Sequence, residues 1–227
     1  MPSIHQLNQL EGEIIACRLC PRLVTWREQV AREKRRAYRD QEYWGRPVPG
    51  FGDPQARLLI IGLAPGAHGS NRTGRMFTGD ASGDFLYPAL HRAGFASIPK
   101  AIQRDDGLEL KNLFISAICR CAPPGNKPAR EEIANCLPYL REEINLLPNL
   151  KGIVALGSIA FSETLSLLDQ KQPDRVFGHG VFYELGGGLP WLLASYHPSR
   201  QNTQTGRLTT VMFDSIWQMA RAKLDGA

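Results

Sequence analysis

The chain has 227 residues, of which 43% are apolar and 22% charged, and its formal net charge is +5. These values are typical of an ordinary globular protein, and the length suits one domain over residues 1–227. No apolar run reaches the roughly 18 residues that would cross a membrane, and the N-terminus lacks the apolar core of a signal peptide. We therefore expect a cytoplasmic protein without membrane contact.

The positive charge is concentrated near the N-terminus. Residues 18–46 contain nine Arg and Lys against four Asp and Glu, so this stretch carries the whole net charge. Aromatic side chains are interleaved with the basic ones, a combination that suits a phosphate backbone. A solvated helix face with its aromatic residues in the core explains the pattern equally well. Residues 3–34 are expected to be helical, with an interruption at Pro21.

Four of the five cysteines are spaced like the ligands of a metal site. Cys17 and Cys20 form a CxxC pair, and Cys121 and Cys136 follow much later in the chain. Disulfides are not expected in a cytosolic protein, whereas four thiolates suit either a [4Fe–4S] cluster or a structural zinc ion. Spacing does not choose between the two, and unrelated free thiols are the remaining alternative. Cys119 ends an apolar run and is interpreted as a buried strand residue.

Four short apolar segments are predicted to be buried parallel strands, and helical patterns alternate with them. Alternation of this kind predicts an α/β fold, a three-layer α/β/α sandwich around a central four-stranded parallel sheet. The strands are expected at 57–63, 112–118, 152–156 and 191–196, and the helices between and after them at 82–93, 129–147, 158–168 and 207–224.

Three of these strands are followed by unusual loops. They are the glycine-rich run GLAPGAHGSNRTGRMFTGDASG at 62–83, CAPPGNKP at 121–128 and HPSRQNTQTGR at 197–207. Ligands of α/β proteins bind at the carboxyl ends of parallel strands, so the three loops are expected to share one cleft. Glycine lets a backbone approach a ligand closely, although a long structural loop is the alternative for 62–83.

The polar residues of these loops limit the kinds of reaction that the cleft can catalyse. GxSxG, a P-loop and the HxE pattern of zinc deaminases are all absent, and no Ser–His–Asp arrangement stands out. Asp80 is the acid best placed to activate a water or to stabilise a cation, and its alternative role is that of a helix N-terminal cap. His197 is suited to donate to a leaving group that becomes anionic, or else it only orders the turn before Pro198.

The three loops together resemble the motifs of family-five (B-type) uracil-DNA glycosylases. The glycine-rich run resembles the first motif nearly residue for residue, CAPPGNKP the middle segment, and HPSRQNTQTGRLT the second catalytic motif. Met76 departs from the first motif, which has Pro there, and this bears on the rigidity of the loop. The resemblance implies a uracil-DNA glycosylase-like fold and a structural [4Fe–4S] cluster held by the cysteines that match its ligands, Cys17, Cys20, Cys121 and Cys136.

The resemblance implies an enzyme of base excision repair that hydrolyses the N-glycosidic bond of a base flipped out of double-stranded DNA. Asp80 would activate water and stabilise the sugar cation, Asn126 would assist, and His197 would hydrogen-bond the leaving base. The implied base-binding residues are Gly62, Ala64, Gly66, Ala67, Phe77 and His197, with core packing the alternative for Phe77; the implied DNA-binding residues are Arg72, Arg75, Ser199, Arg200, Asn202 and Gln204.

Two departures from related families bear on the substrate. Leu63 and Ala64 are apolar where other branches carry an acid or an amide, which shifts the handling of water to Asp80. Ala117 stands where the sister four-cysteine family has an Asn that reads uracil, so hypoxanthine and xanthine are expected substrates besides uracil. We expect a monomer. The competing hypothesis is a catalytically silent protein of the same fold that binds damaged DNA.

Overall fold

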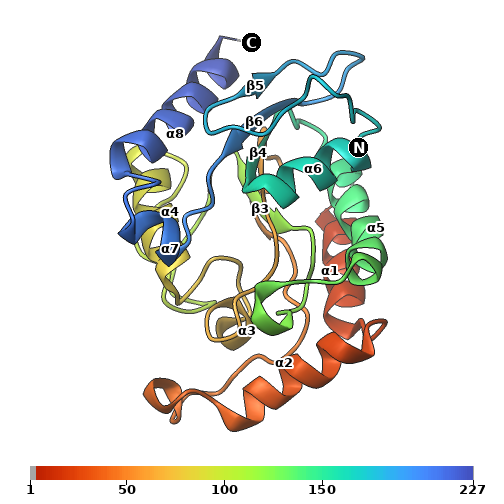
Figure 1. The fold of residues 1–227 in the computed structure, drawn as a ribbon, viewed down its shortest axis with the longest axis vertical. Coiled ribbons are helices and arrows are strands. Elements are labelled where there is room, and N and C mark those ends of the chain that lie inside the picture. The colour runs from red at the N-terminus through yellow and green to blue at the C-terminus, as the bar shows by residue number, and fades with distance from the viewer. Residues whose placement is uncertain (1–3, 227) are drawn as a thin grey trace.

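The computed structural model describes residues 4–226, and its centre is a six-stranded sheet in the order β1-β3-β2-β4-β6-β5 (Figure 1). The four inner strands are parallel, which confirms the predicted fold class, and each lies within one residue of its expected bounds. A short antiparallel strand that was not expected is added at either edge. The strands are β1 (Phe51–Gly52), β2 (Leu58–Gly62), β3 (Leu113–Ala117), β4 (Gly152–Leu156), β5 (Phe182–Tyr183) and β6 (Trp191–Ser195).

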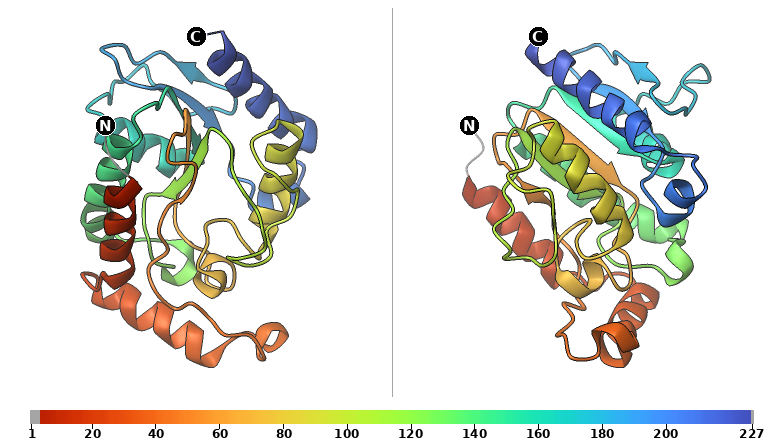
Figure 2. Two further views of the ribbon diagram at one scale, coloured as in Figure 1. Left: turned by 180° about the vertical axis from the view of Figure 1, so that it is seen from behind. Right: turned by 90° about the vertical axis from the view of Figure 1, so that its left-hand side faces the viewer.

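Helices cover both faces of the sheet. α4 and α8 pack on one face, and α5 and α6 pack on the other (Figures 1 and 2). Side chains that alternate along β2 separate accordingly: Leu58 and Ile60 join the α4/α8 core, and Leu59 and Ile61 join the α5/α6 core. These helices, predicted to within three residues at each end, are α4 (Ala81–Arg92), α5 (Arg130–Leu146), α6 (Ser158–Leu167) and α8 (Thr210–Asp225).

The N-terminal segment forms two helices, α1 (Ile4–Ala16) and α2 (Pro21–Glu33), and the break falls where Pro21 predicted it. α1 lies beside α5 (Figure 2). The side chains of Leu10 and Ile14 pack on Leu146. α2 runs across the lower end of the molecule and is followed by the short helix η1 (Arg36–Tyr38) (Figure 1). Within residues 4–226, the longest apolar helical stretch falls short of what a membrane crossing requires.

The three predicted loops leave the carboxyl ends of their strands and each contains one short helical turn. These turns are α3 (Ser70–Thr73) in the glycine-rich loop, η2 (Pro124–Asn126) after β3, and α7 (Arg200–Gln204) after β6. Figure 1 shows all three turns toward the same end of the sheet. The fold thus brings segments that are more than a hundred positions apart in the sequence to one site.

Candidate active site

A cleft of about 770 Å³ lies where the three loops meet. The glycine-rich loop forms most of its wall. The other lining residues include Ala117, Asn126, His197 and 199–201. The predicted convergence of the loops is therefore confirmed. All the residues predicted to bind the base line this cleft, namely Gly62, Ala64, Gly66, Ala67, Phe77 and His197.

Asp80 occupies the N-cap of α4 and also faces the cleft. Its Oδ1 accepts the backbone N–H groups of Ser82 at 3.0 Å and Gly83 at 3.1 Å. Burial raises the pKa of Asp80 above its ordinary value, and the two backbone donors oppose that rise. The two readings of Asp80 are therefore compatible, because one carboxylate oxygen caps the helix while Oδ2 has no hydrogen-bond donor among the described residues.

Two glycines make room for the Asp80 carboxylate. A Cβ added to Gly69 would lie only 1.9 Å from Oδ2, and one added to Gly66 would lie 2.9 Å from the same atom. Real Cβ atoms do not approach an oxygen so closely, so any side chain at Gly69 has to displace the carboxylate. These glycines of the motif thus hold the acid in its place by being small.

His197 and Phe77 both line the cleft, and their rings lie against each other. Their ring centroids are 5.9 Å apart and the planes are inclined by 32°. Burial lowers the pKa of His197 to about 4, so the imidazole is neutral at pH 7 and has one N–H to donate. The amide of Asn202 donates to the His197 carbonyl at 2.8 Å and fixes the backbone of this loop.

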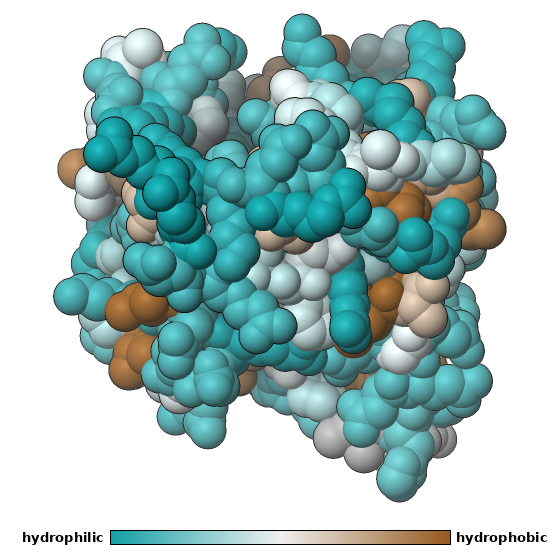
Figure 3. Space-filling model, turned by 90° about the horizontal axis from the view of Figure 1, so that it is seen from below, coloured by the Kyte–Doolittle hydropathy of each residue, from teal (hydrophilic) through white to brown (hydrophobic). Residues whose placement is uncertain are grey.

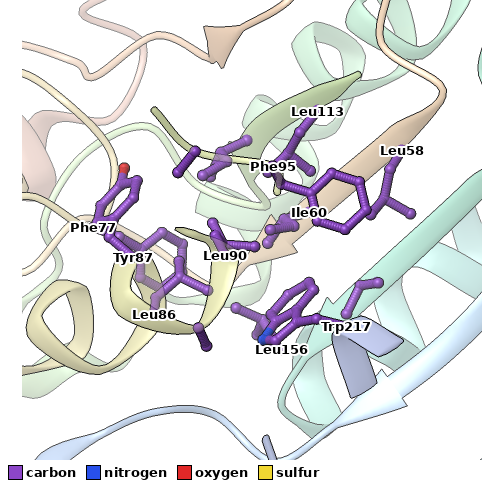
Figure 4. Packing of buried hydrophobic residues seen from close by; sticks show 14 of the residues in the cluster. Leu58, Ile60, Phe77, Leu86, Tyr87, Leu90, Phe95, Leu113, Leu156 and Trp217 are labelled. Atoms are coloured by element: carbon purple, nitrogen blue, oxygen red, sulfur yellow. The ribbon is translucent and has the colours of Figure 1, made fainter. Parts of the chain in front are cut away.

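Phe77 has a backbone conformation that only tertiary contacts explain. Its φ is +52°, in the left-handed region that non-glycine residues rarely adopt. A Cβ at Gly62 would come within 2.8 Å of the Phe77 ring, and one at Gly83 would come within 1.8 Å of its carbonyl oxygen. The ring extends the α4/α8 core toward the cleft, where it lies near Tyr87 (Figure 4). Core packing and a place at the cleft are again compatible.

The loop around Met76 is fixed although the expected proline is missing. Met76 is buried, and its carbonyl accepts hydrogen bonds from the Tyr87 hydroxyl at 2.7 Å and the Thr78 hydroxyl at 3.1 Å. Tyr87 itself belongs to α4 and is fully buried. Hydrogen bonds thus supply the restraint that a proline ring would give.

The other residues that were predicted to take part in catalysis or DNA binding differ in how exposed they are. Asn126 is exposed on η2 with a φ of +57° and lines the cleft. Ser199 caps α7, and both Ser199 and Arg200 line the cleft. Arg200 and Gln204 are exposed, whereas the side-chain amide of Asn202 donates its hydrogen bond to the carbonyl of His197. Ser199, Arg200 and Gln204 therefore remain candidates for DNA contact.

Arg72 and Arg75, which were predicted to contact DNA, are both buried, and their guanidinium groups are held by partners within the protein. Arg72 donates to the carbonyls of His68 and Gly79 at 2.8 and 2.7 Å. Arg75 is only 2% exposed and forms a bidentate pair with Asp106 at 2.7 and 2.8 Å. Both guanidinium groups therefore hold the glycine-rich loop together.

Sequence reasoning missed two cleft residues of the N-terminal segment. Arg35 and Tyr38 line the cleft from η1 and the residue before it. The Tyr38 ring lies 4.1 Å from the Arg72 guanidinium, and nearby Tyr43 shares a 3.0 Å hydrogen bond with Nδ1 of His68. The alternation of basic and aromatic residues was the available signal, but it did not specify which of them reach the cleft.

The four predicted ligand cysteines gather where α2 meets the loop after β3. Cys20 and Cys121 pack on Leu23. Burial raises the pKa of the Cys121 thiol, and Cys17 and Cys136, the latter on α5, lie close enough to help raise it. Within residues 4–226, no three His, Cys, Asp or Glu side chains converge as ligands of a single metal ion. A four-iron cluster is larger than an ion, so its four thiolates stand further apart.

Cys119 belongs to the same neighbourhood. It is fully buried, as expected, but it lies just beyond β3 rather than within it. Its thiol hydrogen-bonds to Cys136, and this bond holds the pKa of Cys136 down to about 7. On the other side, Nη1 of the buried Arg27 donates to Sγ of Cys121 at 2.8 Å. A cation facing these sulfurs fits a site that carries negative charge.

Comparison with known proteins assigns the family. Residues 49–221 match the model of the uracil DNA glycosylase superfamily. A type-5 uracil-DNA glycosylase of Thermus thermophilus is 56% identical over 92% of this chain and 94% of its own. A type-5 enzyme of Mycobacterium tuberculosis is 54% identical over 99% of this chain and 82% of its own. One of Pyrobaculum aerophilum is 43% identical over 93% of this chain and 90% of its own. This chain therefore belongs to the uracil DNA glycosylase superfamily.

Proposed function

We propose that the protein is a DNA glycosylase of base excision repair. It hydrolyses the N-glycosidic bond of uracil, and of the deaminated bases hypoxanthine and xanthine, in double-stranded DNA. The observation that carries the proposal is the cleft, in which a half-buried carboxylate and an aromatic ring of the glycine-rich loop meet a neutral imidazole of the loop after β6. Relatives that are 43% to 56% identical bear the name type-5 uracil-DNA glycosylase.

The reaction follows from the charges that develop as the bond breaks. The target base is extruded from the duplex and enters the cleft beside the Phe77 ring. Its sugar becomes cationic and the base becomes anionic. The Asp80 carboxylate stabilises the cation and orients the water that adds to it, while the neutral imidazole of His197 donates a hydrogen bond to the base. The water oxygen ends on the sugar, and its proton is left for the departing base.

The broad substrate range rests on what the cleft wall lacks. Ala117 ends β3 beside the cleft and offers only a methyl group. Discrimination between bases by an enzyme is strong where a side chain must hydrogen-bond one of them, and weak where the wall is apolar. The neighbouring Leu63 and Ala64 also contribute no polar side chain to the wall. Purine and pyrimidine products of deamination are therefore both accepted.

The cofactor of this proposal is a [4Fe–4S] cluster on Cys17, Cys20, Cys121 and Cys136. Its fit is supported by the buried Arg27, which faces these sulfurs as a cation. These cysteines would hold the cluster between the start of α2, the loop after β3 and α5, where it would act as a structural cross-link, since hydrolysis by water requires no electron. It thereby fixes the basic segment beside the cleft. Replacing Cys17 and Cys20 by Ser is expected to reduce stability and DNA binding together, and a stable, fully active double variant would contradict this role.

The DNA surface extends from the cleft over the lower end of the molecule. Seen from below, this face is largely hydrophilic (Figure 3). Arg35 and Arg200 are exposed and line the cleft, and Gln204 is exposed on α7. Arginines spread over one face hold the phosphate backbone without reading the sequence, so binding is expected to weaken steeply with salt.

Duplexes that carry one uracil, hypoxanthine, xanthine or undamaged base test the function. We expect release of the three deaminated bases and none of the undamaged one. Release of uracil alone would reject the broad range but not the glycosylase. Binding to the uracil duplex without release of any base would instead favour the silent DNA-binding protein.

Replacing Gly69 by Ala is expected to lower the rate of base release about a hundredfold. The added Cβ would lie 1.9 Å from Oδ2 of Asp80, so the carboxylate must move, and displacements of about 1 Å at a reacting group cost this much. Single-turnover kinetics measure the effect. Gly12→Ala is the matched control, because its Cβ meets nothing within 4 Å. A Gly69→Ala rate equal to that of the control would show that the position of the carboxylate does not matter.

The pH profile is expected to show one acid limb and a plateau through neutrality. Burial raises the pKa of Asp80, so the active carboxylate is protonated and the rate falls as the pH drops toward that raised value. His197 protonates only near pH 4 rather than near its ordinary value of 6.5, so it adds no transition around neutrality. Single-turnover rates between about pH 4.5 and 9 check this. An inflection near 6.5 that disappears in His197→Asn would contradict the neutral imidazole.

A further inference from the structure

Among residues 4–226, the buried arginine beside the four-cysteine site finds no carboxylate partner. Arg27 is 2% exposed; Nη1 donates to Sγ of Cys121 at 2.8 Å and Nη2 to the carbonyl of Cys17 at 3.2 Å. Its Nε is buried and has no hydrogen-bond acceptor among the described residues. The neighbouring carboxylate of Glu28 is paired with Arg18 at 2.6 Å instead.

Two other arginines are buried as deeply, and both have an acid. Arg75 pairs with Asp106 at 2.7 Å, and Arg120 pairs with Glu143 at 2.5 Å. A lone buried charge is costly, which is why buried cations are normally paired. Arg27 therefore requires an anion at the place where its guanidinium points, and the side-chain acceptor there is the Sγ atom of Cys121. Neutral thiols are weak acceptors and do not meet this requirement, whereas thiolates do.

We propose that Arg27 is the counter-charge of the loaded four-cysteine site. Four thiolates outweigh the charge of the cofactor, and the guanidinium balances part of the excess inside the protein. Arg27 is a positioning residue that retains the cofactor; it does not touch the DNA base. The inference rests on the cofactor assigned in the proposed function.

The same residue joins the cysteine site to the glycine-rich loop. The side-chain amide of Asn71 donates to the Arg27 carbonyl at 3.2 Å, and the backbone amide of Asn71 donates to Gly66 at 3.0 Å. By retaining the cofactor, Arg27 therefore also fixes α2, to which the glycine-rich loop is hydrogen-bonded. Loss of the cofactor is expected to loosen both α2 and this loop.

The test compares the wild type with Arg27→Gln, Arg27→Lys and the control Arg32→Gln. Arg32 lies on the same helix but is exposed, so the control makes the same change of charge without touching the cysteines. Iron and zinc per chain, the visible absorbance and the rate of metal removal by a chelator are measured on each preparation. Uracil release is measured on the same samples.

We expect Arg27→Gln to lose its metal at least about tenfold faster than the wild type, as for the loss of one hydrogen bond between charged groups. Arg27→Lys keeps the charge and is expected to lie close to the wild type, and Arg32→Gln to equal it. Equal retention in Arg27→Gln and Arg32→Gln would overturn the proposal. So would loss in Arg27→Lys as fast as in Arg27→Gln, since shape rather than charge would then matter.

The remaining outcomes are also decisive. If Arg27→Gln does not fold, Arg27→Lys decides, because a loaded Lys variant supports the charge requirement and an unfolded one rejects it. A wild type without iron or zinc would reject the cofactor and this inference with it. A wild type that holds its metal but releases no uracil would reject the proposed function and leave the role of Arg27 standing.

Discussion

Asp80→Asn is expected to slow the release of uracil by about 10²- to 10⁴-fold while duplex binding is retained. Asn has nearly the same shape and caps helices as well as Asp, so the bonds to Ser82 and Gly83 persist. What is lost is the negative charge beside the sugar cation and the acceptor for a proton of the water. Single-turnover release from a duplex with one uracil measures the effect, and a binding titration accompanies it.

Two further variants separate the catalytic role of Asp80 from its capping role. Asp80→Ala removes the cap as well and is expected to cost about 1 kcal/mol of folding free energy beyond the loss of activity. Glu131→Gln removes an exposed carboxylate from the first turn of another helix, α5, outside the cleft, and is expected to stay near the wild-type rate. A wild-type rate in Asp80→Asn would move catalysis to Asn126 and His197.

His197→Ala is expected to slow uracil release by about 10²- to 10³-fold, the usual cost of removing one donor to a developing anion. The loss should depend on the leaving group. 5-Fluorouracil forms a more stable anion than uracil and needs the donor less, so its release should fall by a smaller factor. Rates for the two bases in wild type and variant, measured under single-turnover conditions, check this.

The matched control for His197 is His91→Ala, since His91 is exposed on α4 and lies outside the cleft. It is expected to leave both rates unchanged. Equal losses for uracil and 5-fluorouracil in His197→Ala would mean that the imidazole only supports the loop. In that case the contact with Phe77, at 5.9 Å between ring centroids, would be its main role.

The sheet and the long helices could be predicted because their signals are local. An unbroken run of apolar residues such as that of β2 is typical of a parallel strand that is buried on both faces of the sheet. The two edge strands could not be found, since two residues give no period. The short turns α3, η2 and α7 depend on contacts made after folding, such as the left-handed Asn126, rather than on their own sequence.

The cleft could be predicted from topology, but burial within it could not. Arg72 and Arg75 look like DNA contacts in a glycine-rich loop, and only the fold shows that carbonyls and Asp106 enclose them. Likewise, the paths of Arg35 and Tyr38 to the cleft depend on how α2 packs across the end of the molecule. For Asp80, the sequence predicts two alternative roles, a helix cap and a catalytic acid. The structure shows that one carboxylate both caps α4 and lines the cleft.

The most direct measurement is the yield of free uracil and of abasic sites from a duplex with one uracil, with enzyme in excess. Wild type is compared with the Asp80→Asn/His197→Ala double variant at equal duplex occupancy. The account predicts equal amounts of uracil and abasic site from the wild type, and a rate at least about a thousandfold lower from the double variant. Release by the double variant at the wild-type rate, or a bound duplex from which the wild type releases nothing, would contradict it.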